Sequence, residues 1–176
     1  LQGDGGDEFF GGYSRYKSYE NIHRWRKLSF LKSLIKWSKT RNTSALRLQR
    51  FINAMTQKEP YQRNALLLTM ESKFTNPIRV FNKLIKKELD KLNPFKRYKE
   101  VYKNYTTRID DTQALFFTDT QIILKDTFFE KVDKSTMANS MEVRVPFIDK
   151  NLTEFMLSLP SKLKTKNGVQ KYLLKK

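Results

Sequence analysis

The 176-residue chain contains no cysteine, which excludes disulfide bonds, thiolate metal sites and cysteine nucleophiles within it. It also lacks any apolar run near the roughly 18 to 20 uncharged residues that a membrane-spanning helix needs. We therefore expect no membrane segment, and the absence of cysteine is compatible with a reducing, cytoplasmic location. Acidic residues are scarce: 18 Asp and Glu stand against 35 Lys and Arg, giving a formal net charge of +17. Apolar residues still make up 39% of the chain, which predicts a folded basic protein and not a disordered polycation.

Glycine is also scarce, and five of the six glycines lie within the first 12 residues. Unusual backbone geometry is therefore expected in one loop. Strand patterns are few, and the alternating residues 143–147 contain Pro146, so they predict an extended segment or a loop. Apolar residues at helical spacing predict a mostly helical chain, with helices at 16–37, 44–55, 78–89, 111–124, 127–137 after a break, 152–159 and from 169.

Three carboxylates separated by glycines stand at residues 3–8, with the sequence Gly-Asp-Gly-Gly-Asp-Glu. If Asp4, Asp7 and Glu8 converge, they can supply part of a site for Mg²⁺ bound to a polyphosphate, since Mg²⁺ takes one or two carboxylates together with phosphate oxygens. The alternative is a tight acidic turn before a helix, where acidic side chains are favourable without any metal. Spacing alone favours the turn.

Two further segments concentrate charged residues. Residues 131–149 contain Asp133, Glu142, Arg144 and Asp149 among apolar neighbours, and the structural interpretation is an ion pair of Glu142 and Arg144 inside the fold. In residues 163–174, an Asn-Gly turn precedes a short predicted helix that carries Lys171 on its first turns. A lysine placed there can reach a phosphate, although most lysines of such a tail only solvate a helix face.

Together and in this order, the three segments resemble the synthetase domain of glutamine-hydrolysing asparagine synthetases. The similar stretches are residues 1–16 (Leu-Gln-Gly-Asp-Gly-Gly-Asp-Glu-Phe-Phe-Gly-Gly-Tyr-Ser-Arg-Tyr), 131–149 (Lys-Val-Asp-Lys-Ser-Thr-Met-Ala-Asn-Ser-Met-Glu-Val-Arg-Val-Pro-Phe-Ile-Asp) and 159–174. They cover roughly a third of the chain, whereas residues 17 to about 110 share only a helical character with the family. The resemblance implies that residues 1–176 are the C-terminal portion of an α/β ATP-pyrophosphatase-like domain.

The resemblance also implies a reaction and roles for individual residues. The family adenylates the side-chain carboxylate of aspartate with ATP and Mg²⁺, and ammonia then captures the acyl-adenylate. Asp7 would bind Mg²⁺ in a nucleotide loop that also contains Gly3, Gly5 and Gly6. Asp4 would lie at the acyl-adenylate, and Lys171 would stabilise the α-phosphoryl charge. The family's shell at the substrate end of the pocket corresponds to Glu142, Arg144 and Asp149.

Two features of the family are absent from these residues. The Ser-Gly-Gly-x-Asp-Ser loop that reads ATP does not occur, and neither does the N-terminal cysteine of the glutaminase domain. We therefore expect a piece of a longer polypeptide that neither hydrolyses glutamine nor adenylates aspartate by itself, and that depends on ammonia from a glutaminase domain.

Two alternatives remain open at this point. Residues 9–63 carry 13 Lys and Arg against two Glu, which is compatible with a nucleic-acid-binding module. No nucleic-acid-binding signature accompanies that charge, so we do not favour nucleic acid as a partner. The second alternative is a family member that amidates another carboxylate, such as a sugar, a peptide or a β-lactam precursor.

Overall fold

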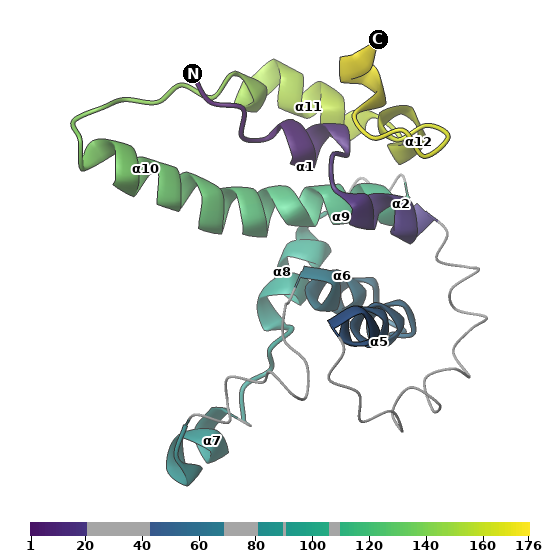
Figure 1. Ribbon diagram of the computed structural model, residues 1–176, viewed down its shortest axis with the longest axis vertical. Coiled ribbons are helices and arrows are strands. Elements are labelled where there is room, and N and C mark those ends of the chain that lie inside the picture. The colour runs from purple at the N-terminus through teal and green to yellow at the C-terminus, as the bar shows by residue number, and fades with distance from the viewer. Residues whose placement is uncertain (21–42, 69–80, 90, 106–109) are drawn as a thin grey trace. The chain divides into compact units, whose positions relative to one another are not determined.

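A computed structural model describes residues 1–20, 43–68, 81–89, 91–105 and 110–176 (Figure 1). The chain divides into two compact units, one formed by Leu1–Asn21 with Val101–Lys176 and the other by Ile22–Glu100. Within the described ranges, every named element is a helix, and the β-structure is limited to an isolated bridge between Lys166 and Val169. The mostly helical prediction is confirmed. The parallel sheet expected for the parent domain is not among these residues and stays a prediction.

The unit of residues 22–100 contains α5 (Thr43–Met55), α6 (Pro60–Leu68) and α7 (Lys83–Leu89). Helices α5 and α6 pack against each other, with Ile52, Met55 and Ala65 buried (Figure 1). The helix expected at 44–55 is confirmed. Helix α6 was not predicted; Pro60 stands at its first helical position, where proline loses no hydrogen bond.

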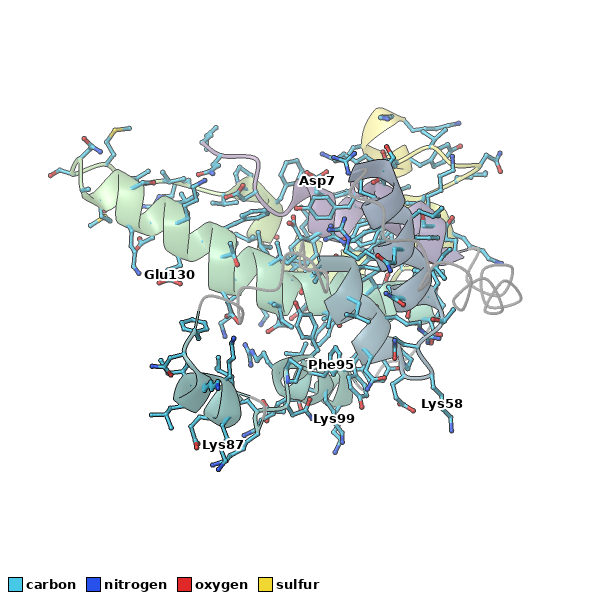
Figure 2. The ribbon with its side chains drawn as sticks, turned by 60° about the horizontal axis from the view of Figure 1, so that its bottom comes forward. Asp7, Lys58, Lys87, Phe95, Lys99 and Glu130 are labelled. Atoms are coloured by element: carbon cyan, nitrogen blue, oxygen red, sulfur yellow. The ribbon has the colours of Figure 1, made fainter. Side chains whose placement is uncertain are left out.

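Charged helices in the middle of the chain match the sequence expectations less well. Helix α7 has no buried residue, and its start falls later than residue 78, with residues 69–80 outside the described part. Helix α8 (Lys96–Asn104) was not predicted, because charged residues outnumber its apolar ones. Lys87 stands on α7 and Lys99 on α8 (Figure 2). Of the helix expected at 16–37, residues 16–20 are helical as part of α2 (Ser14–Glu20), and the remainder lies outside the described residues.

A long helix runs through the unit formed by the two ends of the chain. It begins as α9 (Asp111–Asp119), continues with π-helical geometry as η3 (Thr120–Phe129) and ends as α10 (Glu130–Met137) (Figure 1). The break expected after residue 124 is therefore wrong, since the ten-residue π-helical segment carries the chain through without interruption. Such segments are rare and often lie at functional sites.

The N-terminal helices α1 (Gly6–Phe10) and α2 (Ser14–Glu20) lie against this long helix. Phe9 and Phe10 of α1 are buried with Leu124 and Met156, and the Phe10 ring meets the Phe147 ring edge-on at 5.5 Å. Burial of large apolar side chains is the main stabilising contribution to such a contact. This apolar cluster therefore brings residues from the first, middle and last parts of the sequence together.

The C-terminal segment adds short elements around α1. They are η4 (Pro146–Ile148), α11 (Lys150–Ser158), α12 (Ser161–Lys164) and η5 (Tyr172–Lys175). The extended segment or loop expected at 143–147 is confirmed up to residue 145. Helix α11 confirms the helix expected at 152–159, but one of its apolar side chains, Phe155, is 58% exposed. Helix α12 was not predicted, and the helix expected from residue 169 is a 3₁₀ turn that begins at Tyr172. None of the described helices is both long and apolar enough to cross a membrane.

Candidate functional site

The acidic glycine loop folds into a tight turn followed by the single-turn helix α1. Gly5 precedes the helix with φ of 90°, and Gly11 ends it with φ of 75°. Both values lie in the left-handed region, which glycine adopts without a steric penalty. The unusual backbone geometry expected in the glycine-rich loop is therefore confirmed at Gly5 and Gly11.

The three carboxylates of this loop do not converge. Asp4 accepts a hydrogen bond from the Gln2 amide at 2.9 Å, whereas Glu8 is buried and accepts one from the Tyr13 hydroxyl at 2.6 Å. Asp7 instead pairs with Lys171. Among the residues that the structure describes, no three acidic or histidine side chains are grouped to hold a metal ion. A cation site built from all three carboxylates is therefore wrong, and the turn interpretation agrees with the geometry.

Asp7 and Lys171 form the contact that joins two of the segments singled out in the sequence. The Lys171 ammonium lies 2.8 Å from Asp7 Oδ1, and both side chains are partly exposed. The sequence predicted a helix that carries Lys171, but this prediction is wrong. Lys171 has φ of 53° and stands directly before η5. A non-glycine residue in this region is uncommon and marks a constrained position.

A single carboxylate in this position fits a magnesium ion that is shared with a polyphosphate. The Asp7 side chain on α1 (Figure 2) is 40% exposed, and its Oδ1 oxygen takes part in the ion pair with Lys171. Mg²⁺ prefers one or two carboxylates, with phosphate oxygens and water in its remaining positions. Asp7 can therefore hold such an ion, and Lys171 supplies a positive charge beside it.

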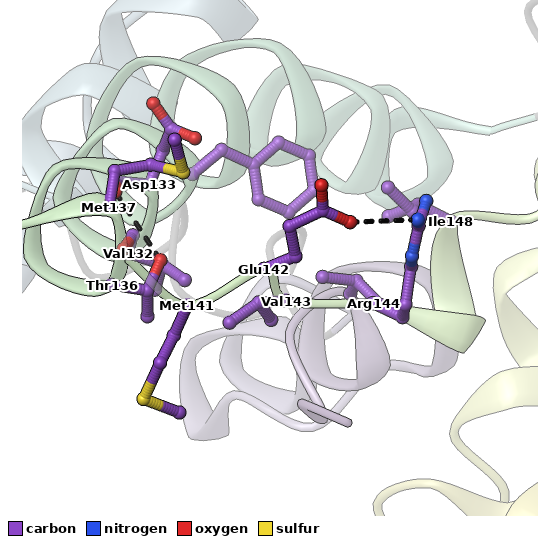
Figure 3. A pocket seen from close by; sticks show the side chains of 11 residues that line it. Val132, Asp133, Thr136, Met137, Met141, Glu142, Val143, Arg144 and Ile148 are labelled. Atoms are coloured by element: carbon purple, nitrogen blue, oxygen red, sulfur yellow. Dashed lines mark hydrogen bonds and ion pairs between the residues drawn. The ribbon is translucent and has the colours of Figure 1, made fainter. Parts of the chain in front are cut away.

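Residues 131–149 supply most of the lining of an open pocket of about 430 Å³ beside α10 (Figure 3). The pocket has an apolar wall and three charged residues, Asp133, Glu142 and Arg144. The Arg144 guanidinium donates to Glu142 Oε2 at 2.9 Å. The expected pairing is confirmed but its expected place inside the fold is wrong, because the two side chains are 79% and 78% exposed.

The pocket and the glycine loop are neighbours. The backbone N–H of Gln2 donates to the Arg144 carbonyl at 2.9 Å. A Cβ placed on Gly5 would lie 3.5 Å from Ile148, which belongs to the pocket wall. Asp149 does not line the pocket; its carboxylate accepts a hydrogen bond from the Leu152 N–H and caps α11. The structure therefore places Glu142 and Arg144 at the pocket and gives Asp149 a supporting position.

Sequence reasoning missed two buried charged residues behind this site. Asp119 and Lys164 are both inaccessible to solvent. Burial raises the pKa of the Asp119 carboxyl to about 6. The nearby Arg15 guanidinium lowers this pKa, because it favours the ionised carboxylate, but the effect of burial is larger. Burial also lowers the pKa of the Lys164 ammonium to about 7. Asp119 lies four and three residues after Leu115 and Phe116, so the sequence places it on the same helix face as these apolar residues. No such spacing indicates that Lys164 is buried, because it stands in a lysine-rich segment.

Tyr16, which follows the glycine loop closely in the sequence, belongs to the core of its unit. Tyr16 is fully buried and meets the Phe116 ring edge-on at 4.2 Å, so it packs α2 against α9.

Comparison with known proteins agrees with the resemblance of the three segments. The family profile described as asparagine synthase matches residues 1–176. Glutamine-hydrolyzing asparagine synthetase 1 of Bacillus subtilis (strain 168) is 33% identical over 184 residues, covering 100% of the chain and 27% of that protein. The putative asparagine synthetase of Mycobacterium bovis (strain ATCC BAA-935 / AF2122/97) is 27% identical, covering 100% of the chain and 26% of that protein.

A vertebrate relative matches over a shorter stretch. The Gallus gallus asparagine synthetase is 41% identical over 61 residues, which is 32% of the chain and 11% of that protein. No solved structure matches the chain. The chain spans about a quarter of the length of the two bacterial relatives. Since the family profile covers all 176 residues, the chain belongs to the asparagine synthase family.

Proposed function

We propose that the chain is part of an ATP-dependent ligase that converts aspartate to asparagine. The observation that carries this proposal is the pairing of Asp7 with Lys171 at 2.8 Å, beside a pocket lined by Glu142 and Arg144. A carboxylate that can hold Mg²⁺ and a cation that can bind phosphate thus lie together, next to a pocket with both signs of charge.

The proposed reaction has two covalent steps. An oxygen of the aspartate side-chain carboxylate attacks the α-phosphorus of ATP, and the bond from that phosphorus to the bridging oxygen breaks, releasing pyrophosphate. Ammonia then attacks the acyl carbon, the bond from carbon to the adenylate oxygen breaks, and AMP leaves while nitrogen loses a proton. Charge stabilisation on the transferring phosphoryl group is the main contribution that a protein makes to such a step.

The acidic loop would hold the nucleotide end of the substrates. Asp7 would bind the Mg²⁺ that neutralises the pyrophosphate group, and Lys171 would stabilise the α-phosphoryl charge. Gly3, Gly5 and Gly6 allow the backbone to approach the nucleotide. Asp4, held by Gln2 at the start of the loop, would lie at the acyl-adenylate and accept the proton from attacking ammonia.

The pocket beside α10 would hold the amino acid. Aspartate carries an α-ammonium and an α-carboxylate, which match the Glu142 carboxylate and the Arg144 guanidinium respectively. In this arrangement, Asp149 acts by fixing the start of α11 after the pocket wall. The ammonia would come from glutamine hydrolysed by a glutaminase domain, and the location would be cytoplasmic.

Aspartate-dependent exchange of labelled pyrophosphate into ATP tests the proposal in the protein as it is naturally expressed. Exchange that requires both aspartate and Mg²⁺, with asparagine formed when ammonia is added, would support it. Asp7→Asn is the informative variant, since it keeps the side-chain size but removes the metal-binding charge, and it should abolish the exchange. Exchange that requires a different carboxylate would retain the adenylation step but replace aspartate as the substrate.

A further inference from the structure

A chain of polar contacts runs from the acidic loop into the interior of the larger unit. The Tyr13 hydroxyl donates to Glu8 Oε1 at 2.6 Å, and the Arg15 guanidinium carbon lies 4.0 Å from the centre of the Tyr13 ring. Arg15 Nη2 then lies 2.8 Å from Asp119 Oδ2. The chain thus links α1 to the C-terminal end of α9 through hydrogen bonds, a cation–π contact and an ion pair.

Asp119 is the buried end of this chain. Its side chain is inaccessible, and the Tyr16 hydroxyl donates to the same Oδ2 oxygen at 2.5 Å. Asp119 is the last residue of α9, directly before the π-helical segment η3. A buried carboxylate is costly unless it is paired, so Arg15 and Tyr16 must be held beside it. The segment that follows α1 is thereby fixed to the long helix.

Helix α1 needs such an external constraint, because it has only five residues and glycines on both sides. A single turn of helix is not stable by itself, and its orientation depends on its contacts. Asp7 and Glu8 are consecutive on this turn, so their side chains point about 100° apart. Glu8 is 1% exposed, whereas Asp7 is 40% exposed. Fixing Glu8 inward therefore fixes the direction in which Asp7 points outward.

We propose that Arg15 and Asp119 are positioning residues that orient Asp7 through Tyr13 and Glu8. This inference rests on the proposed function, in which Asp7 holds the magnesium ion. The buried Phe9 and Phe10 attach α1 to the apolar core, and the polar chain adds the rotational constraint that hydrophobic contact, being non-directional, does not provide.

The test uses the naturally expressed protein with variants graded along the chain of contacts. Asp119→Asn and Arg15→Gln remove the charges of the buried pair. Arg15→Lys keeps the positive charge but loses the planar guanidinium. Tyr13→Phe keeps the ring beneath Arg15 and loses only the hydroxyl that binds Glu8. Lys91→Gln serves as a matched control, because it removes an exposed ion pair with Glu88.

Each variant is characterised by aspartate-dependent pyrophosphate exchange and, independently of activity, by calorimetric binding of Mg²⁺·ATP. Misplacement of Asp7 should lower kcat on the order of a hundredfold in Asp119→Asn and Arg15→Gln, and weaken Mg²⁺·ATP binding. Tyr13→Phe should lower kcat by about tenfold, the loss expected for one hydrogen bond to a charged group. The KM for aspartate should stay unchanged, and Arg15→Lys should restore part of the loss.

Several results would overturn the positioning role. If Tyr13→Phe and Arg15→Lys remain folded with wild-type kcat and Mg²⁺·ATP binding, the chain of contacts has no influence on Asp7. The same conclusion follows if the aspartate KM rises as much as kcat falls. Tyr13→Phe keeps the test decisive if Asp119→Asn does not fold. A wild-type protein that binds Mg²⁺·ATP but shows no exchange would count against the proposed function alone, since the binding measurements still test the positioning.

Discussion

The Lys171 ammonium lies 2.8 Å from the Asp7 carboxylate directly over the backbone of Gly12. A Cβ placed on Gly12 would overlap Asp7 Oδ1 and lie 2.5 Å from Lys171 Cε. The Gly12 N–H also donates to the Asp7 carbonyl at 2.8 Å. Glycine at position 12 is therefore required by the ion pair above it and not by its own backbone conformation, because its φ is not positive.

The first prediction follows from this overlap. Gly12→Ala should displace the Asp7 carboxylate and the Lys171 ammonium from each other while the fold persists, since both are ends of flexible side chains. Pyrophosphate exchange by the naturally expressed protein should fall on the order of a hundredfold. Ser14→Ala, at a neighbouring exposed position, is the matched control. Wild-type exchange in Gly12→Ala would show that the pair is not needed for adenylation.

The second prediction concerns stability at Gly11. Gly11 has φ of 75°, and a Cβ there would lie 2.8 Å from Thr165 Cγ2 and 3.3 Å from the Phe116 ring. Gly11→Ala should lower the free energy of unfolding by about 1 to 3 kcal/mol, because alanine is strained in the left-handed region and the neighbouring atoms are close. Urea unfolding measures the loss.

Gly3→Ala is the control for this stability measurement. A Cβ on Gly3 meets no atom within 4 Å, and its φ is not positive. Its urea midpoint should match that of the wild type. Equal midpoints for Gly11→Ala and Gly3→Ala would contradict the strain assigned to Gly11.

Much of the candidate site could be predicted from the sequence, because its charged residues lie in short local motifs. The glycine loop, Lys171 and the pair of Glu142 and Arg144 were each recognisable, and the family resemblance is what predicts that they share one site. The helices with a clear apolar stripe, such as α5 and α11, were also predictable. Spacing alone did not show that Asp4, Asp7 and Glu8 turn to three different partners.

The remaining features depend on tertiary contacts that leave little trace in the sequence. Pro60 can end one helix or begin the next, and only the packing of α6 on α5 decides between them. Lys164 looks like any lysine of a basic segment, yet it is buried with its ammonium 2.8 Å from Gln113 Oε1. Burial of this kind is set by the surrounding helices and not by the local residue pattern.

The third prediction uses the lowered pKa of Lys164. In the folded protein this pKa is about 7, because burial disfavours the charged ammonium, whereas the ordinary value is 10.5. Between these values the unfolded chain binds more protons than the folded chain. The free energy of unfolding should therefore rise with pH over this window, with a contribution of at most about 1.4 kcal/mol per pH unit.

Lys164→Met tests this pH dependence, since methionine keeps a long unbranched side chain without an ionisable group. Urea unfolding at several pH values from 7 to 10 should show a smaller slope for Lys164→Met than for the wild type. Lys162→Met, at an exposed position of the same helix, should leave the slope unchanged. An identical slope in wild type and Lys164→Met would mean that the buried amine does not titrate in this window.

The fourth prediction separates structural from functional roles of Glu142 and Arg144. Their ion pair spans 2.9 Å, but both side chains are more than three-quarters exposed. Exposed ion pairs contribute little to stability, so Glu142→Gln and Arg144→Gln should each change the free energy of unfolding by no more than about 0.5 kcal/mol. Urea unfolding measures this change.

If the pair instead recognises the α-ammonium and α-carboxylate of aspartate, the same two variants should raise the KM for aspartate about tenfold or more, since each loses a hydrogen bond between charged groups. Glu130→Gln is the matched control, because Glu130 pairs with Lys134 on α10 and does not line the pocket. Its aspartate KM should equal that of the wild type. Unchanged KM values in Glu142→Gln and Arg144→Gln would show that the pair does not recognise aspartate. Neither stability nor substrate recognition would then depend on it.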